Sequence, residues 1–163
     1  NLNEVVFING AIEALFLLNK HYHLFIVSNQ EGISKKLITD SDVSLVNDYI
    51  QNECIKKGVY IKDFYVCPHQ RLENCKCIKP NPYFLHIASQ KYGIKLEDSF
   101  VIGDHPHDIE LAENAGAKGI YVLTGHGKKH LNEIKNKHTH VLESIRDAVD
   151  YILAENKINT LWE

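Results

Sequence analysis

The chain has 163 residues, a length that suits one domain with a substantial hydrophobic core. Its net charge of -3 gives no general basic surface for nucleic acid, and no apolar run approaches the roughly 18 residues of a membrane span. No signal peptide opens the sequence, and clustered cysteines without one indicate a reducing, cytoplasmic location.

Helical and extended patterns alternate along the chain. In chain order we expect a helix at 10–20, a strand at 24–27, a helix at 41–57, a strand at 64–66, a helix at 82–92, a strand at 99–102, a helix ending at about 115, a strand at 120–123, a short helix, an extended stretch near 141 and a last helix at 144–155. Asn9 and Asn81 are expected to cap the first and third helices, with Pro82 in the first turn of the third.

This alternation predicts an α/β fold, a parallel sheet with helices on both faces. Ligands of such sheets bind beyond the carboxyl ends of the strands. Polar clusters follow the strands here: Ser28 and Asn29 after the first, a cysteine-rich loop after the second, and residues 104–108 after the third. We therefore expect these clusters to meet at one edge of the sheet and form a single site.

The cysteine-rich loop runs from Cys67 to Pro80 and holds three of the four cysteines of the chain. Cys67, His69, Cys75 and Cys77 have the composition of a tetrahedral Cys3His zinc site, which normally stabilises structure. A disulfide is the alternative, but it would leave one thiol over and the Cys-x-His pair unexplained. The fourth cysteine, Cys54, stands on a predicted helix and is expected to be a small buried residue.

Three polar side chains after the first two strands are candidates for binding a phosphate group. Ser28 offers a hydroxyl, Asn29 an amide N–H, and Lys79 a cation that the folded loop would hold near a helix N-terminus. A polar turn cap is the alternative for the Ser-Asn pair, and a solvated lysine is the alternative for Lys79.

Two aspartates after the third strand are candidates for a magnesium site. Asp104 follows an apolar strand and a glycine, and Mg2+ prefers one or two carboxylates together with phosphate and water. Asp108 lies one helical turn further, where it can face the same ion or orient its waters. The alternative for Asp108 is an acidic residue of a first helical turn, stabilised by the helix dipole.

With these motifs in hand, the chain resembles the haloacid dehalogenase (HAD) superfamily, in its zinc-containing, capless branch. The resemblance is carried by residues 27–33, by the Cys-Pro-His…Cys-x-Cys-x-Lys-Pro loop, and by Gly103-Asp104 with Asp108 and Ala115-Gly116. It implies a Rossmann-like fold and Mg2+-dependent hydrolysis of a phosphomonoester. It also implies phosphate binding by Ser28, Asn29 and Lys79, Mg2+ binding by Asp104, and structural zinc on the four loop residues.

The family opens with a strand ending in Asp-x-Asp, whose first aspartate is the nucleophile and whose second is the general acid. No Asp-x-Asp occurs near the N-terminus here. We expect residues 1–163 to be a single HAD-like domain whose nucleophile strand lies on a segment upstream of this sequence. That strand would sit between the strands at 24–27 and 99–102. The alternative, of another class, is a catalytically inactive, zinc-stabilised binding protein.

Substrate identity depends on positions where the chain departs from the branch. Ile78 stands where these relatives usually have arginine, and His105, a candidate phosphate-binding residue, stands where they have lysine or arginine. Arg71, Lys128 and Lys129 are candidates to restore the charge. The stretch 124–127 favours enzymes that hydrolyse a heptose 1,7-bisphosphate at its 7-phosphate, for lipopolysaccharide precursors, over histidinol-phosphatases. The absence of a basic excess argues against a DNA 3′-phosphatase. We expect a monomer that acts on a small sugar phosphate.

Overall fold

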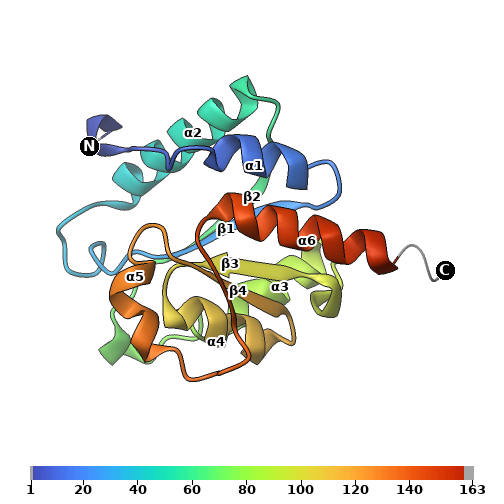
Figure 1. Ribbon diagram of the computed structural model, residues 1–163. Helices are drawn as coiled ribbons and strands as arrows, with labels where there is room; N and C mark the ends of the chain where they lie inside the picture. Colours follow the sequence, from blue (N-terminus) through green and yellow to red (C-terminus); the bar gives the residue numbers. More distant parts are fainter. Residues whose placement is uncertain (1, 160–163) are drawn as a thin grey trace.

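The computed structural model describes residues 2–159, in which helices and strands alternate as predicted (Figure 1). The strands are β1 (Leu24–Asn29), β2 (Ile61–Cys67), β3 (Phe100–Gly103), β4 (Lys118–Val122) and β5 (His140–Leu142). The α-helices are α1 (Ala11–Leu18), α2 (Asp40–Lys56), α3 (Tyr83–Tyr92), α4 (Pro106–Ala115), α5 (Gly127–His130) and α6 (Ile145–Asn159). Short 3-10 helices are η1 (Leu2–Glu4), η2 (Arg71–Glu73), η3 (Leu96–Asp98) and η4 (Leu131–Glu133).

All the strands pair in parallel, in two groups. β1 pairs with β2, and the register places Asn29 opposite Cys67, so two of the predicted polar clusters share one edge. β3, β4 and β5 form the second group. Within the described residues no backbone ladder joins β1 to β3. The parallel α/β architecture is confirmed, and the sheet has an interruption at its centre.

Helices cover both faces of the strands. In Figure 1, α1, α2 and α6 lie on one side and α3 and α4 on the other. The first and last helices pack together above β1 and β4, because each presents small or aliphatic side chains on one face. This shared core contains Ala14, Leu18, Leu24, Ile120, Val122, Ala148, Val149 and Ile152.

Burial differs between the strands that border the interruption and their neighbour. Ile120, Tyr121 and Val122 of β4 are buried, whereas every residue of β3 is only partly buried although the strand is apolar. β1 is likewise only partly buried beyond Leu24. An apolar parallel strand normally has both faces covered and both edges paired. β1 and β3 therefore each retain an edge that can accept a further strand.

Two predicted helix caps are wrong. The N-cap of α1 is Gly10, not Asn9, because the chain enters this helix through a left-handed residue with φ 76°, a conformation that glycine adopts without strain. The N-cap of α3 is Pro82, not Asn81, whose side-chain amide instead donates to the Cys75 carbonyl at 3.0 Å and ties the cysteine loop to the helix. Among the described helices, none is long and apolar enough to span a bilayer.

Candidate active site

Cys67, His69, Cys75 and Cys77, here called the cysteine cluster, converge at the carboxyl end of β2. Their potential ligand atoms all lie within 4.8 Å of one another. The Sγ atom of Cys67 lies 3.5 Å from that of Cys75 and 3.2 Å from that of Cys77. The Sγ atoms of Cys75 and Cys77 are 3.7 Å apart. The Nδ1 atom of His69 lies 3.8 Å from the Cys67 sulfur and 3.5 Å from the Cys77 sulfur.

These separations fit a bound tetrahedral cation. Zn–S bonds of about 2.3 Å give a tetrahedron with S···S edges of about 3.8 Å, whereas a disulfide would bring two sulfurs to about 2.05 Å. The cysteines of the cluster are free thiols, so the disulfide alternative is not what the structure has. Burial and the neighbouring Cys77 thiol raise the pKa of Cys67 to about 12. The raised pKa means that the Cys67 thiolate is costly to form in the protein alone. A bound divalent cation would stabilise that thiolate, so the donor set fits zinc.

Lys79, two residues after the cluster, is held by three contacts at the end of β1. Its Nζ donates to Asp108 at 2.7 Å and to the Val27 carbonyl at 3.0 Å. The side chains of Lys79 and Asp108 are only 17% and 9% exposed. The backbone N–H of Lys79 donates to Asn29 Oδ1 at 3.0 Å. The structure thus brings Asn29, Lys79 and Asp108 together, with Ser28 beside Asn29 on β1.

Asp104 lies at the carboxyl end of β3 and has a defined orientation. Its Oδ2 accepts the backbone N–H of His126 at 2.7 Å, which links the ends of β3 and β4. Gly125 makes this approach possible, because it has φ 63° and a Cβ there would collide with the Asp104 carboxylate. Tyr121 braces the same loop by donating to the Gly127 carbonyl at 2.8 Å. Asp104 is therefore fixed in the position predicted for it.

The start of α4 connects the two aspartates. Asp108 Oδ2 accepts the backbone N–H of His105 at 3.2 Å, and the His105 ring accepts the backbone N–H of His107 at 3.2 Å. A Cβ on Gly103 would collide with the Asp108 side chain, so the glycine before Asp104 admits this carboxylate. Asp108 faces Lys79 and thereby orients the ammonium group.

Four histidines, here called the histidine corner, gather beside Asp104: His105, His107, His126 and His130. The rings of His105 and His107 stack with centroids 4.5 Å apart, and the rings of His105 and His130 are 4.7 Å apart. Burial lowers the pKa of both His105 and His107. Only His105 had been singled out from the sequence. The sequence does contain a signal for the other three. Two histidines follow the strand expected at 99–102 and two follow the strand expected at 120–123, and both strands are expected to end at the same edge of the sheet.

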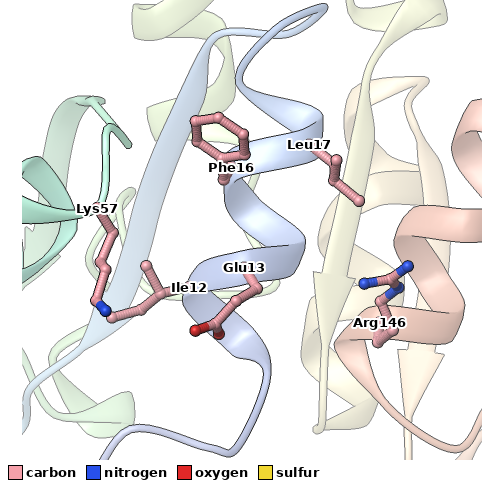
Figure 2. A pocket seen from close by; sticks show the side chains of 6 residues that line it. All are labelled: Ile12, Glu13, Phe16, Leu17, Lys57 and Arg146. Atoms are coloured by element: carbon pink, nitrogen blue, oxygen red, sulfur yellow. The ribbon is translucent and has the colours of Figure 1, made fainter.

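The hollow shown in Figure 2 does not belong to this site. It is open, about 320 Å3 in volume, and lies between α1 and α6 rather than at the strand ends. Apolar residues of α1 line it, with charged groups around them; the lining residues are Ile12, Glu13, Phe16, Leu17, Lys57 and Arg146. None of the predicted site residues lines it, so the carboxyl ends of the strands remain the candidate active site.

Comparisons with known proteins agree with this fold. Residues 76–148 match the HAD-hydrolase-like family. The structure of a D,D-heptose 1,7-bisphosphate phosphatase from B. bronchiseptica, complexed with magnesium and phosphate, superposes with a TM-score of 0.88, at 24% identity over 95% of this chain and 88% of that one. At this identity the likeness shows a shared fold.

Comparison of sequences identifies the family more narrowly than comparison of folds. A D-glycero-beta-D-manno-heptose-1,7-bisphosphate 7-phosphatase of Helicobacter pylori is 31% identical over 86% of this chain and 81% of its own length. An alpha-anomer enzyme of Campylobacter jejuni is 33% identical over 78% of this chain and 73% of its own. The chain belongs to the heptose-1,7-bisphosphate 7-phosphatase family of HAD-like hydrolases, which confirms the resemblance seen in the sequence.

Proposed function

We propose that the protein is a Mg2+-dependent phosphatase that removes the 7-phosphate of D-glycero-D-manno-heptose 1,7-bisphosphate. The observation that carries the proposal is the convergence of Asn29, Lys79 and Asp108, from three distant segments, beside the carboxyl end of β3. The names of the family members supply the substrate. We further propose that the protein acts as a monomer in the cytoplasm.

In this proposal each polar cluster has one task. Ser28, Asn29 and Lys79 bind the phosphate group that is transferred, and Asp108 positions the Lys79 ammonium toward it. Asp104 holds Mg2+, with Asp108 able to order the waters of the ion. The bound ion would neutralise charge on the phosphate oxygens. Cys67, His69, Cys75 and Cys77 hold a structural zinc ion that fixes the backbone leading to Lys79.

The nucleophile is proposed to be an aspartate on a further strand between β1 and β3. Two observations support it: the facing edges of β1 and β3 are not paired with each other in the described residues, and both strands are only partly buried. The only Asp-x-Asp of the chain, Asp40 to Asp42, is engaged at the start of α2, where Asp42 accepts from Thr39. The carboxylate would attack phosphorus, and the P–O bond to the sugar would break as the second aspartate of the Asp-x-Asp motif protonates the leaving oxygen. Water would then hydrolyse the aspartyl-phosphate, releasing inorganic phosphate and restoring the carboxylate.

Phosphate release by the full-length protein tests the proposal. With Mg2+ present, we expect release from heptose 1,7-bisphosphate and much less from histidinol phosphate, and we expect Lys79→Ala to remove most of the activity. Lys91→Ala is the matched control, because Lys91 pairs with Asp63 rather than with any site residue. The alternatives predict other outcomes of the same assay. Faster release from histidinol phosphate than from heptose 1,7-bisphosphate would support a histidinol-phosphatase. Release from neither compound would contradict the proposal and favour the zinc-stabilised binding protein. An intact mass from the native source, greater than that of 163 residues, is expected if the extra strand exists.

A further inference from the structure

The segment from Lys79 to Pro82 carries the proposed phosphate-binding lysine but has few backbone donors of its own. Two of its four residues, Pro80 and Pro82, have no backbone N–H group. The segment belongs to no helix or strand, so no regular pattern of backbone hydrogen bonds fixes it. What holds its carbonyl groups therefore decides how firmly Lys79 is placed.

Asparagine side chains from two distant elements bind these carbonyl groups. Asn29 of β1 donates from Nδ2 to the Lys79 carbonyl at 3.4 Å, and its Oδ1 accepts the Lys79 N–H at 3.0 Å. Asn114 of α4 donates from Nδ2 to the Pro80 carbonyl at 3.0 Å. Consecutive residues of the segment are thus fastened to the strand on one side and to the helix on the other.

Asn114 serves no local purpose in its own helix. It is an exposed residue in the last turn of α4, where asparagine is a weaker helix former than alanine. The end of the helix is closed by Gly116, which has φ 73° and donates its N–H to the Ala112 and Glu113 carbonyls. Asn114 is therefore not the cap of α4, and its amide is used across the fold.

α4 consequently holds the lysine segment at two places. Asp108 in its first turn accepts from Lys79 Nζ at 2.7 Å, and Asn114 in its last turn binds the Pro80 carbonyl. These two anchors are six residues apart, or about 9 Å along a helix. The helix begins two residues after Asp104, so one rigid element relates the ammonium group and its backbone to the proposed Mg2+ ligand. A cation and a metal ion that bind the same phosphate act together only when their separation is fixed.

We propose that Asn114 is a positioning residue of the candidate active site. Through the Pro80 carbonyl it fixes the Lys79 segment on α4 and thereby sets where the ammonium group lies relative to Asp104. This inference rests on the proposed function, because it concerns the placement of the same phosphate-binding lysine. Asn114 contacts no phosphate itself and acts only through Lys79.

The reactivity of the Lys79 amine tests this placement without any measurement of activity. The full-length protein, loaded with zinc and magnesium, would be treated briefly with acetic anhydride, and the modified lysines would be quantified by mass spectrometry. We expect Asn114→Ala to raise the labelling rate of Lys79 about 3- to 10-fold, the change in population that loss of one hydrogen bond allows. Lys91, which pairs with Asp63, is the internal reference and should be labelled at an unchanged rate.

Further variants show whether the hydrogen bond is responsible. Asn114→Asp keeps the size of the side chain but cannot donate when ionised, so it should raise the Lys79 labelling rate as Asn114→Ala does. Asn114→Gln keeps a donor and should raise it less. The matched control is Asn52→Ala, which removes the same side chain from an exposed position of α2, on the other side of the strands (Figure 1).

A purely structural role predicts a different result. Asn114→Ala exchanges a hydrogen bond for a better helix former, so the urea midpoint of unfolding should change little. If Asn114 only stabilised the fold, the midpoint would fall, and the labelling of Lys79 relative to Lys91 would stay the same. That outcome would overturn the inference.

Kinetics then connect the placement to the proposed reaction. Asn114→Ala should lower kcat/KM for heptose 1,7-bisphosphate by a factor similar to the rise in Lys79 labelling, and should have no further effect in a Lys79→Ala background. An unchanged kcat/KM despite faster labelling of Lys79, or equal losses with and without Lys79, would also overturn the inference. If the protein releases phosphate from no sugar phosphate, the proposed function fails, and the labelling still decides whether Asn114 fixes Lys79.

Discussion

The cysteine cluster and the histidine corner lie at the same edge of the fold, and both gather residues of the kinds that bind metals. In the cysteine cluster the sulfur atoms and Nδ1 of His69 face one another at 3.2 to 3.8 Å. In the histidine corner, Nδ1 of His105, of His107 and of His130 each has a partner of its own. The cysteine cluster thus has the converging donor atoms that the proposed zinc site requires, whereas His105 and His107 in the histidine corner already use Nδ1 as a hydrogen-bond acceptor.

The largest effect is expected from breaking the cysteine cluster. Cys75→Ser should abolish zinc binding, measured by elemental mass spectrometry, and should lower the free energy of unfolding by about 3 kcal/mol or more, because metal binding and folding are coupled. Cys54→Ala is the matched control. Cys54 is buried in α2 away from the cluster, so its replacement should leave the zinc content unchanged. A Cys75→Ser protein that retained full zinc would contradict the assignment.

The pair that joins the two regions should give the next largest effect. Lys79 follows the cluster and Asp108 lies beside the histidine corner, and both are largely buried. Lys79→Met leaves the Asp108 carboxylate without its cation and should cost about 3 kcal/mol in urea unfolding. Adding Asp108→Asn removes that uncompensated charge and keeps an acceptor for the His105 N–H, so the double variant should be more stable than Lys79→Met. Additive losses would show that the pair is not coupled.

A smaller effect is expected at the loop that orients Asp104. Gly125→Ala should cost about 1 to 2 kcal/mol, because the residue has φ 63° and the new methyl group would meet the Asp104 carboxylate. The rate of phosphate release should also fall, because the displaced carboxylate is the proposed Mg2+ ligand. Gly93→Ala provides the control: it has a similar φ of 66° but open space around it, so its cost should be conformational only.

The smallest effect is expected at a charged pair that belongs to neither region. Partial burial opposes ionisation of Asp63, but hydrogen bonds from Lys91 and Tyr92 outweigh it and hold the pKa of Asp63 below its ordinary value of 3.8. This contribution to stability is present above that value and is lost as the pH falls through the lower pKa of the folded state. Because Lys91 is 57% exposed and solvent screens the pair, Lys91→Met should lower the free energy of unfolding at pH 7 only slightly. Urea unfolding at pH 7 and at low pH checks this. If Lys91→Met lowered the free energy of unfolding as much at low pH as at pH 7, the interpretation would be contradicted.

Much of this architecture could be predicted because its signals are local. The apolar runs of β1 and β3, the glycine after α4 and the ligand spacing of the cysteine-rich loop are all contained in short windows of sequence. The contact between Arg71 and His107 could not be predicted, because it spans 36 residues and depends on how the loop folds over α4. The role of His105 as a helix cap was also missed, since imidazole is not among the residues usually expected there. Asn81 failed as a cap because a carbonyl of the cysteine loop competed for its side chain.

The packing of α1 against α6 has a consequence for how the protein is made. The β1–α2–β2 and β3–α4–β4 units are closed by pairings between segments that are nearer in sequence than α1 and α6, so less entropy is lost in closing them. The core over β1 and β4 is different, since it needs the last helix against the first. During synthesis α6 emerges after α1 and all the described strands, so α1 waits with its apolar face uncovered until α6 arrives. The newly made chain is therefore most exposed to aggregation and to chaperones in the interval before α6 emerges.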